Sequence, residues 1–339
     1  GDKYGRKKLL IFFATGLGLS IFLMGFSTSV WQLFILRLVM GIFTGFIPMS
    51  QALIATQTPE DVAGKVLGTL QTGSITGNLM GPLFGGVLAD FVGYGATFQL
   101  TSISVILSAI IVLFGIKEMK LKTSTEESNK IYSSKEVILH ILKHPVLLIV
   151  LLLSTLIQLA HFSVQPILSL YVAKINGTAN IAFFSGIAFS AAGLGNLLMS
   201  RRLGKLGDRI GYIKILIALL FMAGIVYLPA AFVTSIWQLV SIRFLLGIAI
   251  GGIVPLRVAY IRHEAPLSMQ GEVLGYNTSL RFLGNIIGPA LGGMLSGMYG
   301  FSSVFFVTSG LLIISGVIML VTWYKYEFLG KETHSMTRS

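Results

Sequence analysis

The polar residues that could do chemistry in this chain lie mostly inside long apolar stretches. Within "STLIQLAHFSVQPILSLY", Gln158, His161 and Gln165 follow one another at intervals of three and four residues. This spacing places all three on one face of a helix. Amides and an imidazole can bind a polar substrate there, and the imidazole can also titrate near neutral pH. Hydrogen bonding between neighbouring helices is the alternative explanation of the same pattern.

Arginine also occurs inside apolar stretches. Arg37 is followed by glycines four and eight residues later, and the same arrangement recurs around Arg243. An arginine at membrane depth is costly and usually faces a protein partner, so we interpret Arg37 as functional, with a structural ion pair as the alternative. Arg281, Asn277 and Gln71 are weaker candidates for the same interior.

The remaining chemistry-bearing residues exclude most enzyme classes. All thirteen Asp and Glu residues fall in loops or at the ends of apolar stretches, so no buried carboxylate pair is expected. Cysteine is absent, and His140 and His144 lack a third ligand nearby, so neither a thiol nucleophile nor a metal site is predicted. No Walker-type phosphate loop occurs. We therefore expect no catalytic residues and no cofactor.

The composition indicates a membrane protein. Hydrophobic residues make up 54% of the 339 residues and charged residues 11%, with a mean hydropathy of +0.83. Soluble domains carry about 25% charged residues. Ten stretches are long enough to cross a bilayer as helices, for which about 20 residues suffice. They are 9–27, 31–54, 66–91, 97–116, 146–171, 181–200, 215–233, 237–260, 273–295 and 303–324.

The basic residues predict the orientation of these helices. Alternate loops, beginning with the N-terminal cluster, hold 21 of the 25 Lys and Arg residues, and this count assigns Arg257 to a loop at 257–272. The positive-inside rule then places the N-terminal loop, the central loop and the C-terminus in the cytoplasm. The net charge of +12 is thus a topology signal, and no nucleic-acid partner is expected.

One long polar connection divides the chain. It predicts an N-terminal bundle at 1–116, a central cytoplasmic loop at 117–144, a C-terminal six-helix bundle at 145–325 and a cytoplasmic tail at 326–339. Within the loop, "SKEVILHILKH" fits either a short amphipathic helix at the membrane surface or a solvated linker.

The two halves are repeats of each other. "GDKYG" and "WQLFILRLVMGIFTG" recur 206 residues later, and "GKVLG" and "GNLMGPLFGG" recur 207 residues later, each with substitutions. Two apolar stretches precede the second copy, "GDRIG", but none precedes "GDKYG". We therefore expect an all-α membrane protein with ten helices present of twelve and two pseudo-symmetric halves. A true ten-helix protein is the alternative.

These features resemble the major facilitator superfamily over essentially the whole chain. The family's loop between its second and third helices carries G-x-x-x-D-R/K-x-G-R-K/R. The positions that fit here are Asp2, Gly5, Arg6 and Lys7 in the first half and Gly204, Asp208, Arg209 and Gly211 in the second. The resemblance implies a latch that holds the bundles together on the cytoplasmic side. The second copy departs from the motif at Tyr212 and Ile213, and a positive-inside anchor is the alternative interpretation.

The most specific match is G-x-x-x-G-P-x-x-G-G, the antiporter signature of drug–proton exchangers. Its fixed positions are Gly77, Gly81, Pro82, Gly85 and Gly86. Glycines four residues apart let another helix approach closely, and Pro82 removes one backbone hydrogen bond. In the same family the element around Arg37 is linked to proton coupling.

The resemblance implies a monomeric transporter of the cell (cytoplasmic) membrane that exports small lipophilic or cationic compounds in exchange for protons. Its partners would be the substrate, protons and the lipid bilayer, with the proton gradient as energy source. Because no acid lies at mid-membrane, the proton would be carried by a carboxylate on the two helices expected before residue 1, or by His161 in its place. Export of sugars or metabolites on the same fold, or a non-transporting sensor, are the alternatives.

Overall fold

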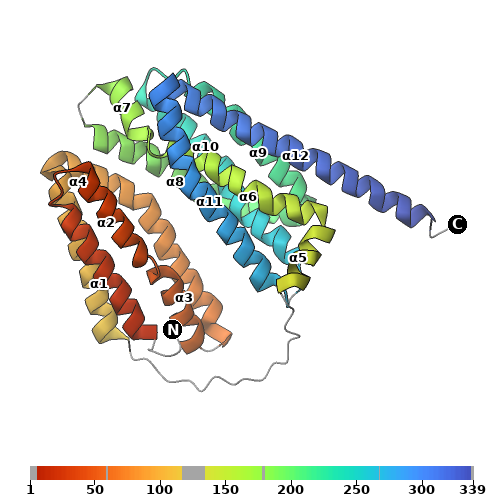
Figure 1. The fold of residues 1–339 in the computed structure, drawn as a ribbon, viewed down its shortest axis with the longest axis horizontal. Coiled ribbons are helices and arrows are strands. Elements are labelled where there is room, and N and C mark those ends of the chain that lie inside the picture. The colour runs from red at the N-terminus through yellow and green to blue at the C-terminus, as the bar shows by residue number, and fades with distance from the viewer. Residues whose placement is uncertain (1–5, 59, 117–133, 178–179, 267, 337–339) are drawn as a thin grey trace. The chain divides into compact units, whose positions relative to one another are not determined.

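The computed structural model describes residues 6–58, 60–116, 134–177, 180–266 and 268–336, and the regular elements in these ranges are α-helices (Figure 1). Contacts divide the chain into unit 1, Gly1–Glu126, and unit 2, Glu127–Ser339. The helices of unit 1 are α1 (Arg6–Met24), α2 (Val30–Ile42), α3 (Phe46–Gln57) and α4 (Glu60–Gly115). Those of unit 2 are α5 (Ser134–Lys143), α6 (Pro145–Val164), α7 (Leu168–Asn176), α8 (Ile181–Ile210), α9 (Tyr212–Ala230), α10 (Ile236–Glu264), α11 (Gln270–Tyr299) and α12 (Phe301–Met336).

Unit 1 departs from the expected spans in two places. The stretch expected as one helix at 31–54 is interrupted, because a tight turn separates α2 from α3. There Phe43 N donates to Met40 O at 3.0 Å, and Thr44 Oγ1 donates to Gly41 O at 2.8 Å. The two spans expected at 66–91 and 97–116 both lie in α4. They are joined at Gly93, whose φ of 82° is a conformation that glycine adopts readily.

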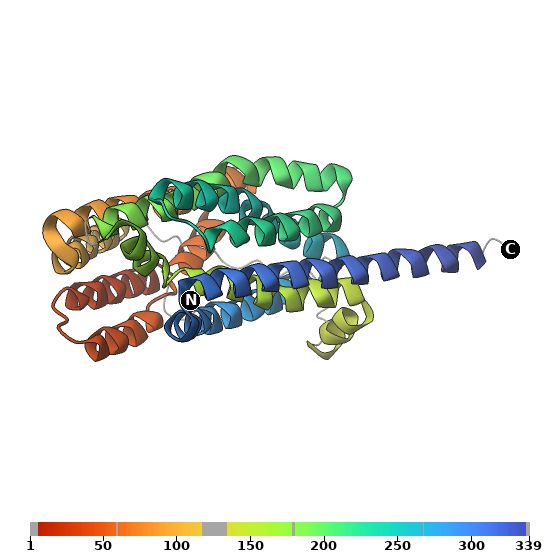
Figure 2. The same ribbon diagram turned by 90° about the horizontal axis from the view of Figure 1, so that it is seen from above.

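Unit 2 consists of two groups of three long helices. α8, α9 and α10 pack on one another, as do α6, α11 and α12, and the contact between α9 and α12 joins the groups. α12 extends beyond its neighbours at the C-terminal end (Figures 1 and 2). The chain bends next to Pro166, because α6 ends at Val164 and α7 begins at Leu168. α5 forms as a helix with Val137 and Ile141 buried.

Equivalent hydrogen bonds confirm the internal repeat. Ser102 Oγ of α4 donates to Gly18 O of α1 at 2.7 Å, and Ser309 Oγ of α12 donates to Gly224 O of α9 at the same distance. The start of the "WQL" helix is also repeated. Gln32 accepts from the Thr28 backbone N–H, as Gln238 does from Thr234. The recurring Gln is therefore part of a helix-capping arrangement.

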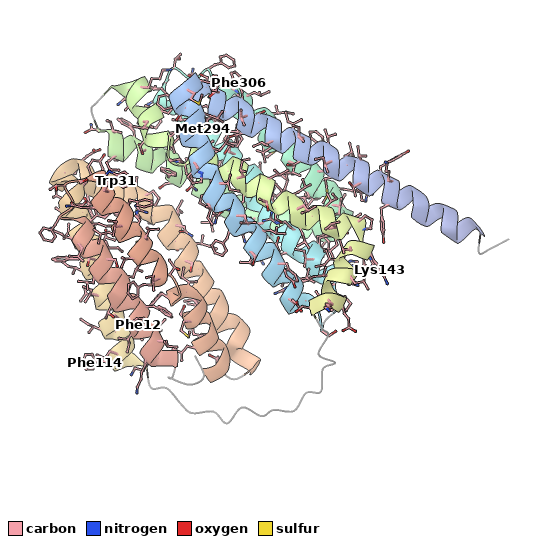
Figure 3. The ribbon with its side chains drawn as sticks, in the orientation of Figure 1. Phe12, Trp31, Phe114, Lys143, Met294 and Phe306 are labelled. Carbon is pink, nitrogen blue, oxygen red and sulfur yellow. The ribbon has the colours of Figure 1, made fainter. Side chains whose placement is uncertain are left out.

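The outer surfaces of both units suit a bilayer. Seven of the described helices are long and apolar enough to cross a membrane by length and composition. Large apolar side chains are exposed on both units, among them the labelled Phe12, Trp31, Phe114, Met294 and Phe306 of Figure 3. The number of ten spanning helices stays a prediction. Seven helices qualify by length and composition, and one of these, α4, contains two of the expected spans.

Candidate functional site

The interior of unit 2 contains a cluster of polar side chains between α6, α8, α9 and α10. Arg243 of α10 is 3% exposed and lies at its centre. Its guanidinium carbon is 5.6 Å from the Phe189 ring centroid, and its Nε donates to Ala188 O at 3.5 Å. Tyr227 lies beside the guanidinium, although its hydroxyl makes no hydrogen bond of ordinary geometry. Arg243 is thus held by packing more than by strong hydrogen bonds.

His161 of α6 belongs to the same cluster. It lies close enough to Arg243 for the two side chains to interact electrostatically, and its ring meets Phe162 edge-on at 5.5 Å. Its Nδ1 atom is buried and has no hydrogen-bond partner. An imidazole with a free ring nitrogen can still accept or donate a proton.

The two glutamines predicted to share a face with His161 have different surroundings. Gln158 is 8% exposed and faces α11. A Cβ added to Gly284 of α11 would lie 2.8 Å from the Cβ of Gln158. Gln165 lies at the end of α6, where its carbonyl accepts a hydrogen bond from Leu168 N at 3.4 Å. Gln158 and His161 therefore face different helices, α11 and α10, although both belong to α6.

Arg257 is the residue that the sequence analysis assigned wrongly. It lies within α10, not in a loop, and its exposed fraction is 0%. Its Nε, Nη1 and Nη2 atoms are all buried without a hydrogen-bond partner. The signal was present in the sequence, because residue 257 falls inside the predicted span 237–260, four helical turns after Arg243.

Arg281 of α11 is the charged neighbour of Arg257. The two guanidinium groups are close enough to interact electrostatically. Arg281 Nε is buried without a partner, as is Oδ1 of Asn285, one turn further along α11. Asn277, one turn before Arg281, accepts a hydrogen bond from Ser154 of α6 at 2.7 Å. Polar groups thus continue along α11 from the α6 contact towards α10.

The glycine motif behaves differently in its two copies. In unit 2, a Cβ added to Gly284 or Gly288 would lie 2.5 Å from Thr155 O and 2.8 Å from Leu159 O, respectively, and one added to Gly292 would overlap Ser163 O. The α6 and α11 backbones therefore touch along this stripe, as small residues allow. We call this contact the α6–α11 seam.

In unit 1 the equivalent glycines have open space. A Cβ added to Gly77, Gly81 or Gly85 would meet no atom within 4 Å. α4 remains helical through Pro82, and its one non-helical residue is Gly93. Among the described residues of unit 1, no helix covers this face, whereas α6 covers its counterpart in unit 2. Gly86, the last position of the motif, is buried.

Arg37 differs from its repeat counterpart in the same way. Arg37 is exposed on α2, and Gly41, one turn later, has no neighbour within 4 Å of an added Cβ. In unit 2, Arg243 is buried, and a Cβ on Gly247 would overlap Ala192 O of α8. Arg37 and Arg243 thus occupy equivalent positions in the repeat, but Arg37 is exposed within its unit and Arg243 is buried.

The predicted latch is partly described. Asp2 and Gly5 lie outside the described residues, and Arg6 begins α1. Lys7 Nζ donates to Leu113 O at 2.6 Å, a favourable position for a cation at the C-terminal end of α4. This bond joins the two ends of unit 1.

The second copy of the latch motif forms a tight helix junction. Gly211 has a φ of 109° and donates to Gly207 O at 2.8 Å, while Gly204 and Arg209 lie in the last turns of α8. Asp208 accepts a hydrogen bond from Tyr212 Oη at 2.8 Å. Tyr212, which departs from the motif, therefore holds the carboxylate within its own unit.

A repeated set of apolar helices, with glycine contacts and buried arginines in unit 2, is typical of membrane transport proteins. The chain belongs to the Major Facilitator Superfamily, whose family profile matches residues 1–203 and 166–335.

Relatives support this assignment. The chain is 52% identical to "Uncharacterized MFS-type transporter YuxJ" of Bacillus subtilis (strain 168), covering 94% of this chain and 81% of the relative. It is 41% identical to "Multidrug resistance protein MdtG" of Salmonella typhimurium, covering 93% and 78%. Among solved structures, an inward-facing, unoccupied bacterial homologue of the human lysosomal transporter Spinster has a TM-score of 0.73 at 16% identity, covering 95% and 82%. That likeness shows the fold.

Proposed function

We propose that the protein exports small lipophilic compounds in exchange for protons. The observation that carries this proposal is the complete antiporter signature at 77–86 in a chain 41% identical to proteins named for multidrug resistance. Cationic compounds are the less favoured substrates, because the described interior of unit 2 holds Arg243, Arg257 and Arg281 and no carboxylate. The protein would act as a monomer in the cytoplasmic membrane, with both ends of the chain cytoplasmic and no cofactor.

The roles within this proposal follow from the chemistry of each residue. Gln158 and Gln165 would contact the substrate, and His161 would carry the proton, since its Nδ1 has no protein partner. Arg37 would couple proton movement to the change of conformation. The latch residues and the glycines of the antiporter motif would control the rocking of the two halves.

Transport by the reconstituted full-length protein tests the proposal. Proteoliposomes loaded with the neutral lipophilic dye Nile red should transport it only when a pH gradient is imposed. His161→Gln should remove the dependence on the gradient. His263→Gln is the matched control, because His263 is 70% exposed at the end of α10. Dye movement that ignores the gradient in the unaltered protein would contradict proton coupling.

A further inference from the structure

A fully buried arginine, Arg257, and its partly buried neighbour, Arg281, have no counter-ion among the described residues. Arg257 is fully buried, and none of its three guanidinium nitrogens has a hydrogen-bond partner. Removing a cation from water without pairing it costs several kcal/mol, so a charged group in such a place usually has a function. A ligand that supplies the missing acceptors would bind with a gain in stability.

The nearby acids of unit 2 are engaged elsewhere. Glu264 follows Arg257 by seven residues, roughly 10 Å along α10, and pairs with His263 at 3.5 Å. Glu272 precedes Arg281 by nine residues on α11, roughly 14 Å, and accepts from Tyr276 Oη at 2.8 Å. Within the described part of the chain, no carboxylate pairs with either arginine.

The second arginine makes the arrangement more specific. Arg257 and Arg281 come from different helices, yet their charges lie close enough to repel each other. An anion bound to both would turn this repulsion into attraction. The guanidinium fork matches the two oxygens of a carboxylate or phosphonate.

Asn285 adds a neutral polar group to the same region. Its side-chain oxygen is buried without a partner, one turn from Arg281. Because the two ends of an amide can be exchanged by rotating it, Asn285 can present either its oxygen or its NH₂ group to a ligand.

The internal repeat separates this pair from the common scaffold. Arg243 has a counterpart in Arg37, but Arg257 aligns with Ser50 or Gln51, and Arg281 aligns with Ser74. The arginine pair therefore belongs to unit 2 alone. A purely architectural role, shared by both halves, does not explain it.

We propose that Arg257 and Arg281 form a site for an oxyanion, namely a carboxylate, phosphate or phosphonate group. As the anionic end of an exported lipophilic compound, this ligand deepens the proposed function and rests on it. An anionic lipid headgroup offers the same chemistry from a second source.

Three compounds that share one apolar scaffold test the site. The full-length protein is purified in phosphatidylcholine nanodiscs and titrated calorimetrically with 4-phenylbutyrate, 4-phenylbutylamine and 4-phenylbutanol. The carboxylate should bind, and the amine and the alcohol should bind at least tenfold more weakly. Arg257→Gln and Arg281→Gln should each weaken 4-phenylbutyrate binding about 10- to 100-fold, as expected for one hydrogen bond to a charged group.

Arg262→Gln is the matched control, because Arg262 is an exposed arginine on the same helix. It should leave the affinity unchanged. Arg281→Gln keeps the test usable if Arg257→Gln does not fold, since Arg281 is less buried. Weaker 4-phenylbutyrate binding in phosphatidylglycerol discs would identify a lipid headgroup as a competing occupant, and equal binding would identify the soluble anion.

The outcomes separate this proposal from the proposed function. Equal binding of the amine and the carboxylate overturns the anion site, as does unchanged 4-phenylbutyrate affinity in both arginine variants. If the protein exports the dye with protons, but 4-phenylbutyrate neither inhibits this export nor is itself exported, the proposed function stands and the anion site is refuted. Anion binding that depends on Arg257, without any gradient-driven export, supports the site and contradicts the exporter.

Discussion

The α6–α11 seam predicts a large difference between two repeat-equivalent glycines. We expect Gly288→Ala to destabilise the protein, because the new Cβ would lie 2.8 Å from Leu159 O and 3.0 Å from the Phe162 Cβ. The atom in closest contact is backbone, so it cannot rotate away, and the two helices must separate. Gly81→Ala places the same methyl group at the equivalent position of α4, where no atom lies within 4 Å.

The expected magnitude follows from the cost of overpacking, about 1–3 kcal/mol for an added methyl group in a tight contact. For a unit of this size, each kcal/mol lowers Tm by about 2–4 °C. Gly288→Ala should therefore lower Tm by roughly 2–12 °C. Gly81→Ala should change stability by less than about 0.5 kcal/mol, as surface substitutions usually do.

Thermal unfolding of the purified protein in detergent, followed by intrinsic tryptophan fluorescence, measures both variants. An unchanged Tm for Gly288→Ala would refute the backbone contact between α6 and α11. A loss of stability in Gly81→Ala equal to that in Gly288→Ala would show that the face of α4 is covered.

Three further predictions concern smaller interactions. Ser163 and Thr308 share a buried hydrogen bond of 2.9 Å between α6 and α12, and a double-mutant cycle with Ser163→Ala and Thr308→Val should give a coupling energy of about 0.6 kcal/mol; a value near zero would refute the bond. The pKa of His140 lies below its usual 6.5, mainly because the side chain is buried and secondly because His144 is close. An undocked α5 therefore binds the proton more readily than the packed helix does. The packing of α5 should weaken as the pH falls below 6.5. Proteolysis near α5 at pH 7.5 and pH 5.5, each compared with His140→Gln at the same pH, measures this, and an identical pH response of both proteins would contradict it. Tyr212→Phe removes the 2.8 Å bond to the exposed Asp208 and should cost no more than about 1 kcal/mol of unfolding free energy, so a loss of several kcal/mol by thermal unfolding would show that the junction between α8 and α9 depends on this bond.

The sequence predicted those features that depend on local composition and repetition. The family and the helical class were both read from apolar length and matched motifs. The internal repeat was also read from recurring motifs, and the structure repeats it in detail, because Gln32 and Gln238 both accept a hydrogen bond at a helix start.

The remaining features depend on which helix packs against which residue, and a single amino-acid sequence does not contain this information. The turn between α2 and α3, where the Thr44 hydroxyl donates to Gly41 O, lies in a stretch as apolar as its unbroken neighbours. Arg257 was assigned to a loop because charge near the end of an apolar stretch usually lies in water. Its burial comes from the helices packed around α10, among them α8 and α9.

The contact between α9 and α12 has a practical use. Lys214 of α9 lies 5.5 Å from the ring centroid of Trp323 on α12, at the place where the two helix groups of unit 2 meet. Trp31 and Trp237 are the other two tryptophans of the chain, and both are exposed at the starts of their helices. With both replaced by Phe, the emission of Trp323 would report on its distance from the Lys214 ammonium. Trp323 is thus a built-in fluorescent probe of sliding between the two groups of three helices.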